Sequence, residues 1–547
     1  GYGDGGSGCT EEMLEMIRRF DKVSVMPKIE VTGGDAFLHK NLKDNTNLAT
    51  WDGELYLEMH RGTFTTKSNL KKANRTLEFK LRETELRAAL ASLTGTSYPS
   101  EELTECYKKF LLNQFHDILP GSHIHPVYED AMNDYRSVSE RLDAMLALTA
   151  GNEYFNSLNF TRSSITFIED ENGAITRHGV KGFWSIPTLA GLSTGTVAAL
   201  PSKENWLSTE FCDKCDCLVL ETPYYRAKLS SDGSFVSLYD KELDREWVKE
   251  GCGFNKLHLY ADNPGVYDAW DILPNYKDVQ VALNVDKPLA LVSSDGSSAE
   301  FAVTFTTEKS TWKMILRFFA DSRAIEVENV VDWDEKHKLV KVNFGPDVLT
   351  RELVCDTSAG FVKRDLTKNT SWQQARFEVC HHKWCDMSES GSGIAIINEG
   401  KYGVGLEKDE ISLSLLRATI RPDITSDIGH HDFCYTILPH SGDAVEAQVN
   451  KTAMEYNVPL CKSNVTVPAA LRDTLNNCGL YLQAMKRSED GQYLILRLSE
   501  QDGRRGKIAF PFEVQTMNLI EDIEGSTKVV SYHPFELITV AVKPEDL

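Results

Sequence analysis

The hydrophobic pattern of this 547-residue chain changes near residue 154, from a helical period to a strand-like one. Beyond that point short alternating runs follow one another, among them FVSLY, WKMILRFF, IEVENVV, EISLSLL and QYLILRL. Alternation with a period of two predicts half-buried strands. Asp232-Gly233 and Asp490-Gly491 have the residue types of tight hairpin turns. The second part of the chain therefore predicts large sandwich-like β-sheets.

Before the change, apolar residues recur at helical spacing in four segments. The first is the amphipathic EEMLEMIRRF at 11–20, and the second covers 69–91. The third begins at Ser100, which we expect to be its N-cap, and ends at His116. The fourth starts at Pro126, a favoured first-turn residue, and reaches Gly151. Because short links join the last three segments, they predict a three-helix bundle.

The charge balance excludes several classes of partner. The chain has 59 basic and 81 acidic residues, a formal net charge of -22. Such a surface repels nucleic acid and anionic membranes, whereas a neutral sugar is compatible with it. No apolar run approaches the ~20 residues of a spanning helix, so we expect a soluble protein. Since the chain begins with glycine, we expect it to be processed, truncated or part of something larger.

The 12 cysteines are scattered along the chain. This distribution favours free thiols in a reducing compartment, so we expect a cytoplasmic protein, with a lysosome or vacuole as the alternative. Two groups have the residue types of metal ligands: Cys212, Cys215 and Cys217, and Cys380, His381, His382 and Cys385. The first group lacks an obvious fourth ligand, and a structural role is the stronger interpretation for both.

The pentad NQFHD at 113–117, followed by ILPGS, places a histidine beside a carboxylate at the end of a predicted helix. His116 can offer a neutral imidazole to a metal, and Asp117 can orient a bound polar ligand. The same pair also occurs at ordinary helix ends. The surrounding sequence has to decide between the two interpretations.

The surrounding motifs extend in order over nearly the whole chain. They are GYGDGGSG (1–8), WDGELYLEMHRGTFTTKSNLKKANRTLEFKLRETE (51–85), NQFHDILPG (113–121), GSHIHPVYEDAMNDY (121–135), SSDGSFVSLYDKELDREW (230–247), DAWD (268–271), ARFEVCHHKWCDMSESGSGIAIINEGKYG (375–403), LSLLRATIRPD (413–423), GHHDFCYTILPH (429–440) and MKRSEDGQYLILRLSE (485–500). Through these motifs the chain resembles the α-mannosidases of glycoside hydrolase family 38, especially their cytosolic and vacuolar branch. The matched region follows the family's catalytic nucleophile.

The resemblance implies a multidomain α+β architecture. Residues 1–50 would form the C-terminal strip of a (β/α) barrel-like catalytic domain, and 51–151 a three-helix bundle. Residues 152–440 would form a β-sandwich region, and 441–547 a C-terminal β domain. This order agrees with the change of hydrophobic pattern.

The resemblance also implies a zinc-dependent retaining exo-α-mannosidase that removes terminal α-mannose from free oligosaccharides or N-glycan-type glycans. His116 aligns with a zinc ligand, and Asp117 with an aspartate that accepts hydrogen bonds from the sugar. Asp4 aligns with the acid/base carboxyl, although a simple loop aspartate among glycines is the alternative. The nucleophile and the first two zinc ligands are expected upstream of Gly1. We therefore expect the isolated chain to be inactive, and its partner to be the N-terminal half of the same enzyme.

Five further residues are candidate substrate contacts. The resemblance places His60 where related enzymes have a sugar-stacking aromatic residue. Asp268, Trp270 and Asp271 combine a stacking surface with carboxylates, and His382 is a candidate at the edge of the sugar site. For each of them a structural role in the core is the alternative. Zinc is the expected cofactor, with another divalent metal as the alternative. Formation of a homo-oligomer is left open by the sequence.

Two other functions stay open at this point. A non-catalytic carbohydrate-binding or assembly fragment would bind glycans without turning them over. A cysteine-rich metal module around Cys212 would lose its metal on replacement of Cys215.

Overall fold

The computed structural model describes residues 8–45 and 47–547. The chain divides into two compact units, Gly1–Leu57 and Glu58–Leu547. The described part of the first unit contains α1 (Glu11–Phe20) and α2 (Gly34–Leu42). The hydroxyl of Thr10 caps α1 by accepting a hydrogen bond from the Met13 amide, and acidic residues occupy the first turn of the helix. The helix predicted at 11–20 is confirmed.

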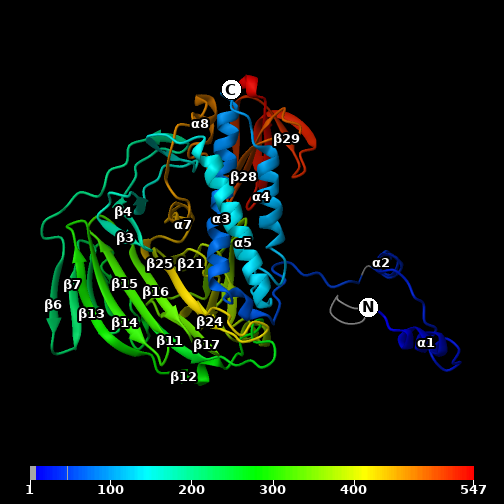
Figure 1. Cartoon of the computed structure of the whole chain (residues 1–547), viewed down its shortest axis with the longest axis horizontal. Helices are drawn as coiled ribbons and strands as arrows, with labels where there is room; N and C mark the ends of the chain where they lie inside the picture. The colour runs from blue at the N-terminus through cyan, green and yellow to red at the C-terminus, as the bar shows by residue number, and fades with distance from the viewer. Residues whose placement is uncertain (1–7, 46) are drawn as a thin grey trace. The chain divides into compact units, whose positions relative to one another are not determined.

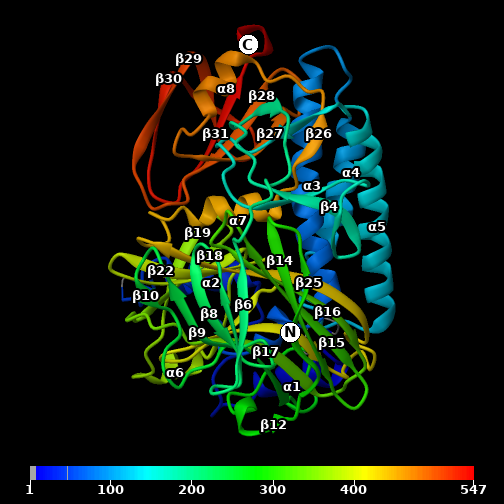
Figure 2. The same ribbon diagram turned by 90° about the vertical axis from the view of Figure 1, so that its left-hand side faces the viewer.

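Three long helices of the second unit pack side by side (Figures 1 and 2). They are α3 (Ser68–Ser92), α4 (Ser100–Leu112) and α5 (His125–Ala147). Leucines of all three, such as Leu77, Leu103 and Leu142, share one buried cluster. Helix α4 begins at Ser100 as predicted, but its N-cap is Pro99 and not Ser100, and the helix stops at Leu112, before His116. Residues 113–121 form turns instead, so His116 lies in a loop.

Two large sheets follow, and the strand pairings between described residues are antiparallel in both. The nine-stranded sheet has the order β13 (Asn284–Ser294), β14 (Ser298–Thr306), β15 (Thr311–Phe319), β16 (Ile325–Trp333), β25 (Gly429–Ser441), β22 (Ser392–Asn398), β21 (Trp384–Glu389), β18 (Glu352–Thr357) and β19 (Gly360–Asp365). The six-stranded sheet has the order β12 (Gln280–Val281), β11 (Phe254–Ala261), β17 (Lys338–Phe344), β24 (Ile411–Ala418), β23 (Gly403–Leu406) and β20 (Glu378–Cys380).

These two sheets pack onto one another through buried aromatic side chains. The ring of Tyr435 in β25 lies 5.9 Å from that of Phe344 in β17, and its hydroxyl donates to Asn255 of β11 over 2.6 Å. A buried tyrosine that keeps a hydrogen-bond partner avoids the cost of an unpaired hydroxyl. The predicted sandwich of β-sheets is therefore confirmed.

Four smaller sheets complete the unit. A five-stranded sheet contains β10 (Arg245–Glu246), β9 (Phe235–Asp240), β8 (Tyr225–Leu229), β7 (Cys217–Glu221) and β6 (Ser208–Cys212). The three-stranded sheets are β2 (Thr166–Glu169), β4 (Val180–Ser185) and β3 (Ile175–Arg177), and β26 (Cys461–Ser463), β1 (Glu153–Asn156) and β5 (Ser193–Gly195). The last sheet contains β27 (Tyr481–Arg487), β28 (Leu494–Ser499), β31 (Leu537–Val542), β29 (Gly506–Met517) and β30 (Ile523–Tyr532).

Short helices connect these elements: η1 (Arg61–Phe64), η2 (Tyr276–Asp278), α6 (Ser371–Ala375), α7 (Val449–Asn457), α8 (Ala469–Leu475) and η3 (Pro544–Asp546). Both predicted hairpin turns are present, with Gly233 at φ 78° between β8 and β9 and Gly491 at φ 72° between β27 and β28. Glycine adopts this left-handed conformation without a steric penalty.

Helix α3 packs against α4 and α5 and also against the last β-sheet of the chain. Its second half packs Leu86 and Leu90 against the sheet that contains β27 and β28. The buried Arg82 donates to the carbonyl of Leu482 over 2.9 Å and to that of Ser157 over 3.1 Å. The first turn of α3 lies at the other end of the helix, beside the loops described next. Among the described residues, no helix is both long and apolar enough to cross a membrane.

Candidate functional site

His116 and Asp117 lie on the surface, in the loop that follows α4. The side chain of His116 is 75% exposed, and its Nε2 atom lies 3.5 Å from a carboxylate oxygen of Asp117. The ring of Phe115 packs against the imidazole, with 4.1 Å between the centroids. Ser122 donates its hydroxyl to the other oxygen of Asp117 over 2.7 Å. The pair is thus held in place and accessible to a ligand.

A buried lysine ties this loop to the start of α3. The ammonium group of Lys71 donates to the carbonyls of Leu119 and Pro120, over 2.9 Å and 3.1 Å, and also to that of Thr66. Burial lowers the pKa of Lys71 to about 7, because the charged form loses its hydration. Gly121, at φ 86°, leaves no room for a side chain beside the Thr66 carbonyl. These contacts fix where the His116 loop leaves α4.

The first turn of α3 is capped from a distant part of the chain. Asp427 accepts hydrogen bonds from the backbone amides of Lys67 and Ser68, each over 2.7 Å. Lys67 and Asp423 form an ion pair with 2% of each side chain exposed, and His125 lies 3.1 Å from the same carboxylate. Burial opposes ionisation of Asp423, but hydrogen bonds from Lys67 and Thr425 hold its pKa well below the usual value. The loop after β24 is therefore locked onto α3 and α5.

The segment before α3 packs against the loop at 266–271. His60 adopts a left-handed conformation (φ 63°), and its side chain is exposed. Two residues further, the amide of Gly62 donates to the Trp270 carbonyl over 2.8 Å. The hydroxyl of Thr66 donates to the carbonyl of Ala269 over 2.9 Å. His60 and the DAWD motif therefore lie on adjoining segments, as a shared site requires.

Arg417 of β24 clamps these segments together. It is fully buried, and its guanidinium donates to Asp262 over 2.6 Å and to Thr66 over 3.2 Å. It also donates to the carbonyl of Asp271. A Cβ atom on Gly62 would lie 2.0 Å from an Arg417 nitrogen, so only glycine fits there. Arg417 was not among the predicted site residues, although it lies inside the LSLLRATIRPD motif, because nothing local in the sequence identifies its partners.

The three candidate sugar contacts in the DAWD motif, Asp268, Trp270 and Asp271, have different environments. Asp268 is buried and accepts from the amides of Ile420 and Arg421, over 2.7 Å and 2.9 Å, so its carboxylate orders the neighbouring loop. Trp270 and Asp271 are half-buried. Trp270 forms an edge-to-face pair with Tyr267, whose ring is 69% exposed. Trp270 and Asp271 thus remain predicted sugar contacts, whereas the geometry of Asp268 favours a positioning role.

His382 lies in the loop after β20, near Arg75 of α3. Its ring meets that of Tyr402 edge to face at 5.8 Å, and its amide donates to the Asp356 carbonyl over 3.1 Å. Burial and the nearby Arg75 lower its pKa to about 3. Asp4, the predicted acid/base, lies outside the described residues. The structure therefore brings the segments of His60, Trp270 and Asp271 together and connects the His116 loop to them through Lys71 and Thr66.

The two predicted cysteine groups do not coincide with the group of potential metal ligands among the described residues. All twelve cysteines are free thiols. Cys212 and Cys217 lie opposite each other in the antiparallel register of β6 and β7. Cys217 is buried, and Cys215 is exposed in the turn. Among the described residues, the group of histidine, cysteine and carboxylate side chains close enough to hold a metal is His178, Glu399 and Cys434, which includes no member of either predicted cysteine group.

His116 fits the role of one ligand in a shared metal site. Zinc in catalytic sites takes three protein ligands and a water or substrate. The exposed Nε2 of His116 is available, and Asp117 is the carboxylate beside it. Those two groups do not complete a zinc site.

Exposed apolar side chains flank His116 and Asp117: Leu111 (61%), Leu112 (61%), Phe115 (54%) and Ile124 (54%).

Three family models match the chain in order. They are the alpha mannosidase middle domain over residues 58–151, the glycosyl hydrolases family 38 C-terminal domain over 220–425, and the glycosyl hydrolases family 38 C-terminal beta sandwich domain over 479–540. The first of these models ends where the hydrophobic pattern changes. The other two cover the large sandwich and the last sheet.

Curated relatives carry the name alpha-mannosidase. Alpha-mannosidase 2C1 from Homo sapiens is 30% identical over 92% of this chain and 50% of its own length. An alpha-mannosidase from Saccharomyces cerevisiae is 31% identical over 84% of this chain and 43% of its own length. Alpha-mannosidase G from Dictyostelium discoideum is 27% identical over 98% of this chain and 57% of its own length. The chain thus spans about half the length of the curated relatives it matches.

The fold is also similar to that of a solved alpha-mannosidase from Enterococcus faecalis. The two share 13% sequence identity and a TM-score of 0.73, over 98% of this chain and 74% of the other. The same fold is thus kept at low identity. The three family models and the curated relatives show that the chain belongs to glycosyl hydrolase family 38, of which it carries the middle domain and the C-terminal domains.

Proposed function

We propose that this chain is the C-terminal portion of a zinc-dependent retaining exo-α-mannosidase. Its substrate is terminal α-linked mannose of free oligosaccharides or N-glycan-type glycans. The observation that carries the proposal is the exposed His116–Asp117 pair, in a loop fixed by buried contacts, within a chain that matches family 38 domains in order.

Each residue of the site has a separate role in this proposal. His116 supplies one ligand to zinc, which when bound helps to hold the sugar and stabilise developing charge. Asp117, oriented by Ser122, accepts hydrogen bonds from sugar hydroxyls. Trp270 and Tyr267 offer an aromatic surface on which the pyranose can stack, and Asp271 offers a carboxylate. Retaining hydrolysis needs two carboxyl groups ~5–5.5 Å apart, of which Asp4 is the proposed acid/base and the nucleophile belongs to the N-terminal half.

The surface around His116 supports a role for that second half. Leu111, Leu112, Phe115 and Ile124 are each more than half exposed in this chain. Exposed apolar side chains on one loop region are typical of an interaction site in soluble proteins. We propose that the nucleophile-bearing half covers it and brings the remaining zinc ligands to His116. The free cysteines are consistent with a cytoplasmic location for the assembled enzyme.

The test is replacement of His116 by alanine in the complete enzyme. Zinc content and hydrolysis of a chromogenic α-mannoside should fall together, because a ligand of the catalytic metal is lost. His533→Ala is the control, since this histidine is 64% exposed and pairs with Glu536. Full activity with unchanged zinc in His116→Ala would contradict the assignment. Glycan binding without any turnover in the complete protein would favour a carbohydrate-binding fragment instead.

A further inference from the structure

A short hairpin places a histidine on the nine-stranded sheet, away from His116. Strands β3 and β4 are joined by His178 and Gly179, both with positive φ (50° and 74°), as in the two-residue turns that suit hairpins. The amide of His178 donates to Glu328 of β16 over 2.7 Å. The turn conformation is unfavourable for histidine, so the contacts with the sheet hold it there.

Three potential metal ligands meet at this turn. Nε2 of His178 lies 2.8 Å from Oε1 of Glu399 and 3.3 Å from Sγ of Cys434. The three ligand atoms all lie within 4.8 Å of one another. Donors around one tetrahedral zinc ion, at ~2.0–2.3 Å from it, are separated by roughly 3.5 Å. The observed spacing is therefore close to that of a zinc site and needs only a small outward movement of Glu399.

A backbone hydrogen bond holds Glu399, and two carboxylates face His178, before any ion binds. The amide of Cys434 donates to Oε1 of Glu399 over 2.9 Å, which holds the carboxylate beside the thiol. Nδ1 of His178 faces Asp432 at 3.1 Å and Glu328 at 3.5 Å. In metal sites the second ring nitrogen of a histidine ligand commonly faces a carboxylate, which fixes the ring and its tautomer.

The fixed charges around the three residues leave room for a cation. Five carboxylates are in contact with the cluster or its partners: Glu300, Glu326, Glu328, Glu399 and Asp432. Three cations pair with them: Arg177, Arg317 and Lys72. Five negative and three positive charges leave an excess of two negative charges. A divalent cation that replaces the thiol proton changes this excess to one, so its binding is electrostatically favourable.

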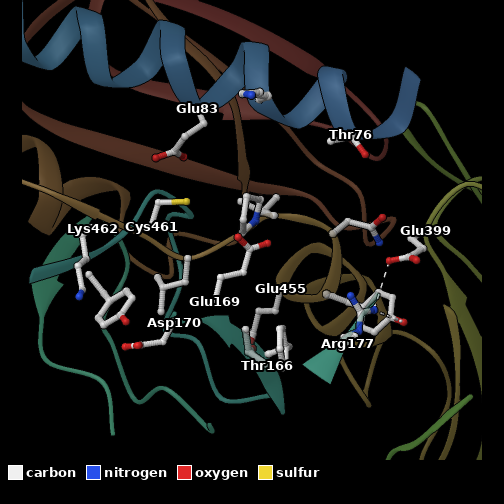
Figure 3. A pocket seen from close by; sticks show the side chains of 18 of the residues that line it. Thr76, Glu83, Thr166, Glu169, Asp170, Arg177, Glu399, Glu455, Cys461 and Lys462 are labelled. Atoms are coloured by element: carbon white, nitrogen blue, oxygen red, sulfur yellow. Dashed lines mark hydrogen bonds and ion pairs between the residues drawn. The ribbon is translucent and has the colours of Figure 1, made fainter. Parts of the chain in front are cut away.

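The cluster lies at one end of a cavity of about 730 Å³ between α3, the β2–β4 sheet and the segment after α7. Figure 3 shows Arg177 and Glu399 in contact at this end, with Glu83 and Cys461 farther along the wall. Glu399 reaches the cavity, whereas Cys434 is fully buried. An ion can thus approach through Glu399, but a substrate cannot reach the sulfur, which excludes a nucleophilic cysteine.

We propose that His178, Glu399 and Cys434 hold one zinc ion, with a water molecule from the cavity as the fourth ligand. The donor set of imidazole, carboxylate and thiolate is one that zinc accepts in tetrahedral geometry. The ion would join the β3–β4 hairpin to β22 and β25 and stabilise their contact. The site is separate from His116, and its presence does not depend on the mannosidase assignment.

The test uses the full chain, freed of metal by a chelator and titrated with Co²⁺ as a spectroscopic substitute for zinc. We expect one equivalent to bind and to give the near-ultraviolet charge-transfer band of a cobalt thiolate. Zinc should displace it. Cys434→Ser should abolish the band, and His178→Gln and Glu399→Gln should weaken zinc binding by at least about tenfold, the smallest loss seen when even an outer partner of a metal ligand is removed.

Matched controls separate this site from the others. Cys385→Ser removes another buried cysteine of the same sheet and should keep the band, as should His116→Ala. A band that persists in Cys434→Ser, or that disappears with Cys215→Ser, contradicts the proposal. So does the absence of any thiolate band in the wild-type chain, a result that needs no folded variant. Mannosidase activity is not part of the readout, so failure here is distinguishable from failure of the proposed function.

Discussion

At the scale of single residues, a few buried polar side chains determine where the site loops lie. Lys71, Arg417 and Asp427 each bind backbone or side-chain atoms from segments far apart in the sequence. Their residue types carry no signal of those partners, so the sequence could not identify them. His116 and Asp117 could be proposed as site residues because they and their neighbours form a motif along the chain.

Gly62→Ala should destabilise the protein by roughly 1–3 kcal/mol, the usual cost of overpacking. The new Cβ would lie 2.0 Å from Arg417 and 3.0 Å from the backbone of Trp270, and both neighbours are held by hydrogen bonds. Urea unfolding checks this. The control is Gly525→Ala, whose nearest neighbour is a threonine hydroxyl at 3.2 Å. Equal losses in both variants would contradict the role of the Arg417 clamp.

Lys71 should make a measurable contribution to the pH dependence of stability. Its pKa is about 7 in the folded state and near 10.4 when unfolded, so between these values the unfolded chain binds more protons. Stability from this group therefore rises with pH across that window, by at most about 1.4 kcal/mol per pH unit.

The measurement is urea unfolding of wild type and Lys71→Met at several pH values from 7 to 9. We expect the difference in stability between them to grow in favour of wild type as pH rises, because the buried amine becomes neutral. Cysteine thiols also ionise in this range, but they do so in both proteins and cancel in the difference. A difference that does not change with pH contradicts a shifted pKa.

At the scale of secondary-structure elements, the hydrophobic period predicted which segments are helices and which are strands, but not where α4 ends. The helix stops at Leu112 because residues 113–121 form turns whose carbonyls bind Lys71 of α3. Likewise, α3 begins at Ser68 because Asp427, 359 residues away, caps it. Both boundaries depend on tertiary contacts that local sequence does not encode.

Asp427→Ala should cost about 1–2 kcal/mol of stability, as loss of an N-cap does, and should fray the first turn of α3. Hydrogen exchange of the Lys67 and Ser68 amides should accelerate. Asp443→Ala is the comparison: this exposed aspartate accepts from Val445 and Glu446, where water can replace it. A larger effect of Asp443→Ala than of Asp427→Ala would show that the cap is unimportant.

At the scale of the whole molecule, the sequence predicted a predominantly β sandwich region that follows several helices, and the structure confirms that arrangement, with the short helices α6, α7 and α8 among its strands. The strand order within the nine-stranded sheet was not predictable, because β25 pairs with β16 and β22 across long stretches of chain. The same holds for the His178 cluster, whose members come from a hairpin turn, the end of β22 and the middle of β25. The family motifs could suggest candidate site residues because each motif is local in the sequence.

We propose that this chain supplies one side of an α-mannosidase site and that catalysis requires another polypeptide segment. The measurement is hydrolysis of a chromogenic α-mannoside, with zinc supplied, by this chain alone and after assembly with the nucleophile-bearing half. The account predicts no turnover by the chain alone and turnover with retained anomeric configuration by the assembly. Turnover by the purified chain alone, or none by an assembly that forms and binds zinc, would contradict it.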